Sequence, residues 1–310
     1  MSLVRRLINH PYGRVLLAGG ILLCATYGSW SITQWLLAQL AADGLNNPLF
    51  PGLALSLAQC ALPFVALNFC CRHLEGRSLA DIGVRLKHIP RDMGLGMLVS
   101  AGIMSLTVLL LARISAYQPV GFCSPADSVA LITGIIASVS APINEEIFFR
   151  GTLFRHLEQY TGSWLALLTS GLIFGFGHSW RPYATWHSSL FLAIDVGFLC
   201  AGLYMLTRSL WVPMGMHFAW NVCEELIYGL PNSGSAPSVS LLHAVVQGPA
   251  WLTGGSFGPE ASIIPFAICL LLNVIVFVLV TKKQAAIRLK KIGKAVTVTS
   301  YNSTVSSGYE

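Results

Sequence analysis

The chain has 310 residues, of which 54% are hydrophobic and 10% are charged. Soluble domains carry about 25% charged residues, so this composition excludes a soluble protein and indicates an integral membrane protein. The formal charge of +6 does not indicate nucleic-acid binding, because the basic residues sit at the ends of apolar segments. The eight cysteines lie mostly inside apolar runs, and we interpret them as small apolar residues rather than a disulfide framework.

Apolar runs of about 20 residues, enough to cross a bilayer, recur along the chain and predict an all-α, polytopic transmembrane helix bundle. The first run follows Arg5 and Arg6 and resembles a signal peptide, but its length predicts a retained helix. The fifth run is the least regular, because the pair Arg181 and Pro182 interrupts it. We expect about eight spans, near residues 15–41, 51–71, 94–112, 128–149, 164–181, 188–207, 210–228 and 262–281.

The basic residues predict how the bundle is oriented. Seventeen of the 19 Lys and Arg lie on the side of the N-terminus, whereas Arg113 and Arg181 lie on the other, so both termini are expected in the cytoplasm. The inner segment 72–92 fits either an amphipathic surface piece or a plain basic loop. We divide the chain into N-terminal helices with a basic cytoplasmic loop, a core, an outer loop, a last helix and a basic, then Ser/Thr-rich cytoplasmic tail, at 1–126, 127–228, 229–261, 262–283 and 284–310.

Two adjacent carboxylates, Glu145 and Glu146, stand in the apolar run that begins near Val129. The whole chain has only 13 Asp and Glu residues, and ionisable groups in a membrane segment are costly and usually face a polar cavity or a partner. Glu146 and Arg150 are spaced i,i+4, which favours an intrahelical ion pair. We therefore favour structural support for these two over catalysis and assign the chemistry to Glu145.

Helix spacing predicts that several polar residues meet at one depth. With a turn at Gly162, Glu145 lies 17 residues before it and His178 lies 16 residues after it, roughly 25 Å in each case. His217 and Asn221 share one helix face. His217 lies nine residues beyond inner-edge Arg208 and Glu145 lies ten before inner-edge Arg155, about 14 Å in each case. A single membrane histidine is commonly only hydrogen-bonded within a bundle, but these four polar residues in one layer indicate a site.

Three further residues near this layer are candidates for lining the cavity. Phe174 begins the Phe-x-x-x-His pattern. Asp195 either serves helix packing or lines the cavity. Glu224, seven residues after His217, either lines an outer vestibule or is solvated at the helix end.

Three motifs carry a family resemblance: Glu-Glu-x-x-x-Arg at 145–150, Phe-x-x-x-His at 174–178 and His-x-x-x-Asn at 217–221. In this order, on successive apolar helices, they resemble the CAAX protease and bacteriocin-processing (CPBP, or ABI) family over residues 127–225. The residues after Arg150 and His178 look like the bacterial branch. The resemblance implies a glutamate-type intramembrane endopeptidase in a multi-pass protein of the bacterial cytoplasmic membrane.

In that family picture, Glu145 is the general base that activates a water with the help of His178, while His217 and Asn221 stabilise the oxyanion. Amide hydrolysis does need a base and oxyanion donors, and no serine triad or His-Glu-x-x-His zinc motif is present in the sequence. We expect no cofactor, although zinc held by His178, His217 and a glutamate stays open. The expected partners are the lipid bilayer and a membrane-embedded protein or peptide substrate, with no nucleic acid; the oligomeric state stays open.

Two other functions compete with the protease. A non-catalytic membrane binding protein, or a bacteriocin self-immunity protein, would keep the same cavity, but the completeness of the motifs favours catalysis. A transporter built on the same polar layer ranks lowest, because no inverted repeat is evident.

Overall fold

The computed structural model describes residues 10–42 and 49–306, and within these residues the protein is a bundle of helices with one small sheet. Six helical stretches are long and apolar enough to cross a membrane, so the predicted all-α, polytopic membrane bundle is confirmed. All eight cysteines are free thiols. The six stretches are Gly13–Leu40, Gly52–Glu75, Leu79–Arg113, Pro125–Thr161, Trp186–Thr207 and Ile263–Ala286.

Helices occupy all eight regions where the sequence predicts spans, but two of them are shorter than a bilayer requires. The helix α8 (Ser163–Phe176) has 14 residues, because Gly177 ends it and a turn follows. The helix α11 (Trp211–Asn221) has 11 residues and continues as the π-helical segment η7 (Val222–Ile227). These two short helices account for the difference between eight predicted spans and six of full length.

The N-terminal part of the described chain is a helical hairpin that packs against the core through α3. Two short 3-10 turns follow, and they bury Ile82 and Val84 in the main hydrophobic core. The segment 72–92 therefore contains short helical turns and is not a plain loop, and its position along the membrane surface stays a prediction. The elements are α2 (Pro11–Ala42), α3 (Leu49–Phe69), π-helical η1 (Cys70–Glu75), η2 (Leu79–Ile82) and η3 (Leu86–His88).

The middle of the chain supplies one long span and then a nearly continuous helical run that turns at Gly162 into α8. This run carries Glu145 and Glu146. Its α-helical turns are interrupted by one π-helical segment, η5, just after the two glutamates. The elements are α4 (Ile89–Arg113), β1 (Tyr117–Phe122), η4 (Pro125–Asp127), α5 (Ser128–Ala137), α6 (Ser140–Phe148), η5 (Phe149–Phe154) and α7 (Arg155–Thr161).

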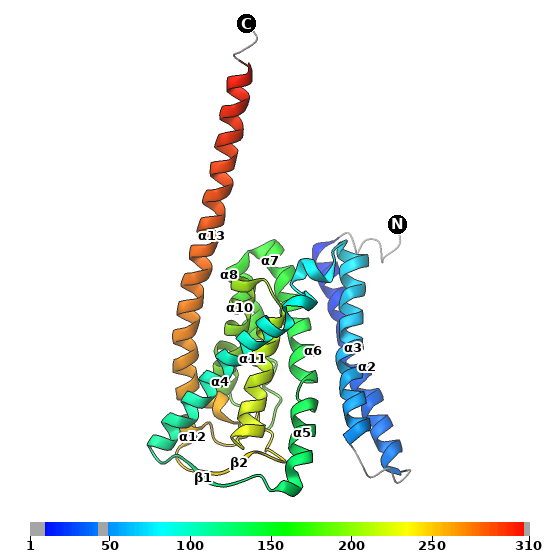
Figure 1. Cartoon of the computed structure of the whole chain (residues 1–310), viewed down its shortest axis with the longest axis vertical. Coiled ribbons are helices and arrows are strands. Elements are labelled where there is room, and N and C mark those ends of the chain that lie inside the picture. Colours follow the sequence, from blue (N-terminus) through cyan, green and yellow to red (C-terminus); the bar gives the residue numbers. More distant parts are fainter. Residues whose placement is uncertain (1–9, 43–48, 307–310) are drawn as a thin grey trace.

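The C-terminal part completes the bundle around α11. The last helix runs through the basic and Ser/Thr-rich tail as far as Ser306, and Figure 1 shows it extending beyond the other helices. The remaining elements are α9 (Trp186–Leu192), π-helical η6 (Ala193–Phe198), α10 (Leu199–Thr207), β2 (Leu242–Val246), α12 (Ala250–Thr253), η8 (Pro259–Ala261) and α13 (Ile263–Ser306).

The helix ends and the connecting segments lie at the two opposite ends of the bundle. The start of α2, the connection from α3 to α4, the α7–α8 turn and the far end of α13 lie at one end of the bundle, whereas β1, β2 and α12 lie at the other (Figure 1). This is the two-sided arrangement that the basic residues predict. Which side faces the cytoplasm stays a prediction.

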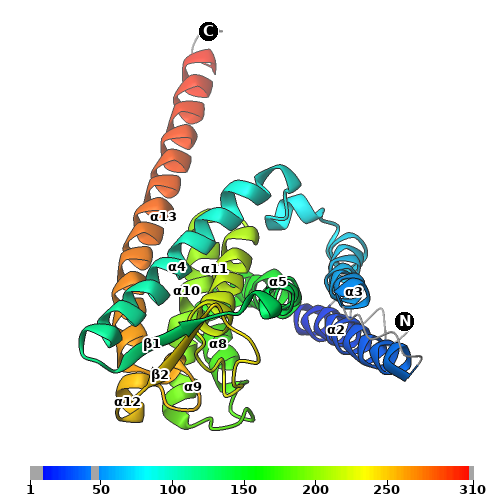
Figure 2. The same cartoon turned by 60° about the horizontal axis from the view of Figure 1, so that its bottom comes forward.

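The sequence did not predict the two strands, which lie in connecting segments. β1 pairs with β2 antiparallel from Tyr117 opposite Val246 to Phe122 opposite Leu242, with an irregularity between Pro119 and Gly121. Figure 2 shows this ribbon next to α12 and α9 at one end of the bundle. The expected outer loop at 229–261 is therefore partly ordered secondary structure.

Two glycines bring α4 and α11 into close contact. A Cβ on Gly96 would overlap the carbonyl oxygen of Val212, and a Cβ on Gly215 would overlap the backbone of Met93. Small residues allow membrane helices to approach at backbone distance. α11 carries His217, so α4 fixes the position of one of the predicted site residues.

Candidate active site

Glu145 faces two imidazole rings. Its Oε2 atom lies 4.0 Å from Nε2 of His178 and 3.9 Å from Nε2 of His217. These separations are too long for direct hydrogen bonds, but both nitrogens surround the same carboxylate oxygen. The Glu145 side chain is 33% exposed and the His217 side chain 7% exposed, so the carboxylate is the more open member of the group.

The other nitrogen of each ring is already used. Nδ1 of His178 lies 2.8 Å from the carbonyl oxygen of Phe174, and Nδ1 of His217 lies 3.0 Å from Oε1 of Glu146. A carbonyl or carboxylate oxygen only accepts hydrogen bonds, so each ring carries its hydrogen on Nδ1. In the neutral tautomer, both Nε2 lone pairs then point towards Glu145.

His178 does not lie in a helix as the sequence predicted. α8 ends at Phe176, and His178 sits in the following turn. The bond from its ring to Phe174 holds the imidazole against the end of that helix. The predicted shared depth with Glu145 nevertheless agrees with the 4.0 Å contact.

Glu146 and Arg150 form the expected i,i+4 ion pair, with 2.7 Å between Oε1 and NH1. Both side chains are fully enclosed, at 0% and 1% exposure. Arg150 also donates through NH2 to the carbonyl oxygens of Val196 and Gly197 in η6. It therefore ties the helix of the two glutamates to a neighbouring helix, in addition to pairing with Glu146.

Phe174 packs in the centre of this arrangement. Its ring is fully buried and lies 5.0 Å from the ring of His178 and 5.7 Å from that of His217. The guanidinium carbon of Arg150 lies 5.0 Å from the same ring, within the range of a cation–π contact. Phe174 therefore contacts the buried arginine and both imidazoles with one ring.

Asn221 is half-buried at the end of α11, and its side chain makes no hydrogen bond to any residue that the structure describes. It lies one turn beyond His217 on the same helix. Its expected part in stabilising an oxyanion stays a prediction.

Comparison with known proteins identifies a family that part of the chain resembles. Residues 127–223 match the family model described as "Type II CAAX prenyl endopeptidase Rce1-like". This segment of the chain is Rce1-like. The family resemblance deduced from the three motifs is thereby confirmed, and Glu145, His178, His217 and Asn221 all fall inside the Rce1-like segment.

One curated relative supports the same assignment. A protein of Bacillus subtilis (strain 168), named "Putative membrane peptidase YdiL", is 37% identical over 87 residues. The match covers 28% of this chain and 33% of the relative, so the chain spans about a third of the protein that it resembles. No solved structure matches the chain.

A second group of carboxyl side chains is buried next to the Rce1-like residues. Asp195 and Glu224 are completely enclosed, and none of their carboxyl oxygens has a hydrogen-bond partner among the described residues. Both interact electrostatically with Glu260, which in turn interacts with His178 and His217. The alternative of a solvated Glu224 is therefore wrong.

Sequence reasoning missed Glu260. It lies 37 residues beyond the Rce1-like segment, in η8, and its Oε2 accepts hydrogen bonds from the backbone and hydroxyl of Ser233 at 2.9 and 2.7 Å. One signal was available, because Glu260 is the only acidic residue between Glu225 and the C-terminal Glu310. A single carboxylate in an apolar, glycine-rich segment indicates a buried partner.

Π-helical turns interrupt the helices that carry the site. η5 follows the two glutamates, η6 supplies the carbonyls bound by Arg150, and η7 begins directly after Asn221. Such turns are rare and occur frequently at functional sites. Within the described residues, no group of three or more His, Cys, Asp or Glu side chains is arranged to hold a metal ion.

Proposed function

We propose that this protein is an intramembrane endopeptidase that hydrolyses a peptide bond in a membrane-associated protein or peptide, with Glu145 as the general base. The observation that carries the proposal is the position of Glu145 between the Nε2 atoms of His178 and His217, at 4.0 and 3.9 Å. The Rce1-like segment and its peptidase-named relative support the same reaction class.

The first step is the activation of water. Glu145 removes a proton from a water molecule, and the water oxygen attacks the carbonyl carbon of the scissile bond. His178, whose Nδ1 hydrogen is committed to a carbonyl oxygen, offers the Nε2 lone pair to the second hydrogen of the same water. A general base of this kind typically contributes a factor of about 10² to 10⁴.

The second step places negative charge on the substrate oxygen, which requires donors. Asn221 supplies an amide N–H. His217 supplies an Nε2–H only as an imidazolium, because its Nδ1 hydrogen already points to Glu146. A protonated His217 together with Arg150 balances the two carboxylates of Glu145 and Glu146, so the enclosed group is neutral overall.

The intermediate then collapses. The oxyanion re-forms a carbonyl, the C–N bond breaks, and Glu145 returns its proton to the leaving nitrogen. The products are a carboxylic acid and an amine, and the glutamate is ready for another water. No covalent link to the protein forms at any stage.

The test compares termini in host membranes that contain the wild type, Glu145→Gln or the control Glu225→Gln. Glu225 is half-buried on η7 and shares no contact with the two imidazoles, so its substitution tests for a general effect of losing a carboxylate. We expect a new peptide terminus with the wild type and with Glu225→Gln, and none with Glu145→Gln. The same terminus in all three membranes would reject Glu145 as the base.

A second pair of variants separates His178 from other histidines. His178→Ala should abolish cleavage while the protein stays in the membrane, whereas His187→Ala, at an exposed position in the first turn of α9, should cleave normally. If no variant and no wild-type sample creates a terminus, a non-catalytic binding or self-immunity function would replace the protease.

A further inference from the structure

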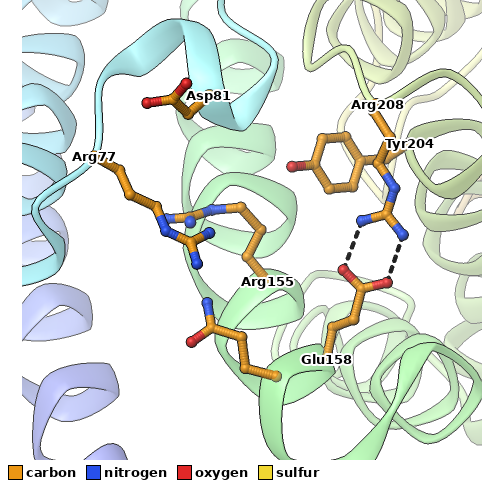
Figure 3. A pocket seen from close by; sticks show the side chains of 7 residues that line it. Arg77, Asp81, Arg155, Glu158, Tyr204 and Arg208 are labelled. Atoms are coloured by element: carbon orange, nitrogen blue, oxygen red, sulfur yellow. Dashed lines mark hydrogen bonds and ion pairs between the residues drawn. The ribbon is translucent and has the colours of Figure 1, made fainter. Parts of the chain in front are cut away.

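A cavity of about 180 Å³ opens at the end of the bundle opposite to β1 and β2, outside the proposed active site. Figure 3 shows three guanidinium groups around it, from parts of the chain that are distant in sequence. Its lining consists of Arg77, Asp81, Arg155, Glu158, Gln159, Tyr204 and Arg208.

The three arginines mark the level where the membrane spans end. Arg77 lies two residues after the span Gly52–Glu75, and Arg208 directly follows the span Trp186–Thr207. Arg155 lies in the last two turns of the span that ends at Thr161. The cavity is therefore at the boundary between the apolar core of a bilayer and its headgroups.

Two of the three guanidiniums already hold a carboxylate. Arg155 binds Glu75 through two bonds of 2.8 and 2.7 Å, and Arg208 binds Glu158 through two bonds of 2.6 and 2.7 Å. Arg77 is exposed, and its side chain has no hydrogen bond or ion pair with any described residue. Arg77 interacts electrostatically with Glu75 and Asp81, but among the described lining arginines it is the one that no carboxylate binds directly.

The cavity has more hydrogen-bond donors than acceptors. A guanidinium has five N–H groups, of which Arg155 uses three and Arg208 uses two. The remaining N–H groups, all five of Arg77 and the amide of Gln159 outnumber the free acceptors of the lining. Oδ2 of Asp81 is held by Ser78, which leaves Oδ1 of that carboxylate. A ligand that only accepts hydrogen bonds and carries negative charge satisfies this surplus.

We propose that the cavity binds the phosphate of an anionic phospholipid headgroup, with Arg77 as its principal contact and Arg155 and Gln159 as further donors. The headgroup level of the cavity favours a lipid over a free anion. Basic residues next to membrane spans attract anionic lipids at the same level. Arginine suits the task, since its planar fork matches phosphate oxygens.

The experiment titrates the purified full chain in a neutral detergent with dioleoyl phosphatidylglycerol and measures binding by native mass spectrometry. Arg77→Ala should weaken this lipid about fivefold to tenfold, as expected for one charge-assisted contact at a surface. The matched control is Lys87→Ala, which removes an exposed cation of the same connecting segment outside the cavity and should leave the affinity unchanged. Melting temperatures of both variants, expected to equal that of the wild type, establish that each is folded.

Each other result overturns the proposal. Equal losses in Arg77→Ala and Lys87→Ala would show diffuse attraction rather than a site. Equal affinity for dioleoyl phosphatidylcholine would show that the site does not require an anionic headgroup. Equal affinity for inorganic phosphate would show that the site does not require a lipid. The cavity would instead bind a peptide carboxylate if a short peptide acid binds and its amide does not. In that case Arg77→Ala would abolish binding of the peptide acid, and the protein would show no preference among lipids.

Discussion

His217 donates through Nδ1 to Oε1 of Glu146 at 3.0 Å. The same oxygen accepts from Arg150 at 2.7 Å, so a single buried carboxylate oxygen joins α6 and η5 to α11. The residue next to the proposed base therefore holds one of the two imidazoles in place. This contact gives Glu146 a positioning role that its ion pair with Arg150 alone did not indicate.

Removal of either member of the buried pair should mainly affect stability. Arg150→Ala removes the cation paired with Glu146 and the side-chain donor to the carbonyls of Val196 and Gly197. Loss of one partner of a buried ion pair costs about 3–5 kcal/mol. Glu146→Gln should be milder, because the amide oxygen can still accept from Arg150 and His217. Melting temperature in detergent, measured beside turnover, should rank wild type above Glu146→Gln and Glu146→Gln above Arg150→Ala.

Glu145→Gln serves as the reference for this series and should melt like the wild type without cleaving. If Glu146→Gln were fully stable but inactive while Glu145→Gln stayed active, the two assignments would be reversed, and Glu146 would be the candidate base.

The proposed cleavage should not require zinc. The proposed reaction uses Glu145 as the base for a free water, so elemental analysis of the purified protein should find no stoichiometric zinc, and incubation with a chelator should not reduce cleavage. One zinc per chain together with chelator-sensitive activity would instead favour a metal held by His178, His217 and a glutamate.

Because α4 and α11 lie so close together, Gly96 should not accept a larger side chain, whereas Gly102 on the same helix should accept one. Gly96→Ala would force a Cβ into the backbone of α11 and should lower stability by roughly 1–3 kcal/mol or more. Gly102→Ala lies on the same helix with open space around it and should be neutral or slightly stabilising. Denaturation of both variants in detergent tests this, and similar stabilities would contradict the observed packing.

Glu260 should give the protein a pH-dependent stability. Burial raises the pKa of this carboxyl above its usual range, and it faces the carboxyls of Asp195 and Glu224 as well as His178 and His217. The folded state therefore holds the proton more tightly than the unfolded state. The stabilisation that protonated Glu260 gives the folded state is complete below the pKa of the unfolded chain. It is lost as pH rises through the pKa of the folded protein.

Glu260→Gln keeps an oxygen that can accept from Ser233 but removes the titration. Its melting temperature should match the wild type in acid and exceed it at neutral to alkaline pH. The control is Asp127→Asn, which removes an exposed carboxyl, leaves Glu260 in place and should keep the decline of the wild type. A Glu260→Gln protein that declines with pH as steeply as the wild type would assign the dependence to other groups.

The sequence was sufficient to predict the bundle and much of the candidate site. The rise per residue of a helix is nearly constant, so counting from Gly162 correctly predicted that Glu145 and His178 meet. Rotation about the helix axis is harder to predict, because a π-helical turn changes the number of residues per turn. η7 begins right after Asn221, so the i+7 extrapolation to Glu224 did not predict its burial beside Asp195 and Glu260.

Contacts across long sequence distances were not predictable in the same way. Glu260 reaches the site from a segment whose glycines and prolines indicated only a loop. The bond between Glu146 and His217 depends on which face of α11 turns inwards, and the packing of α4 through Gly96 and Gly215 determines that. The pattern of apolar residues within the Rce1-like segment does not show which face of α11 turns inwards.

The contact between α4 and α11 also defines what can fold independently. The Rce1-like segment begins at residue 127, yet the backbone of its helix α11 is covered by α4, which ends at Arg113. A fragment cut to the family boundaries would expose that backbone surface and lose the support of His217. We therefore expect the unit that folds to be larger than the unit that the family comparison recognises. The third span supports the proposed active site although it carries none of the three motifs.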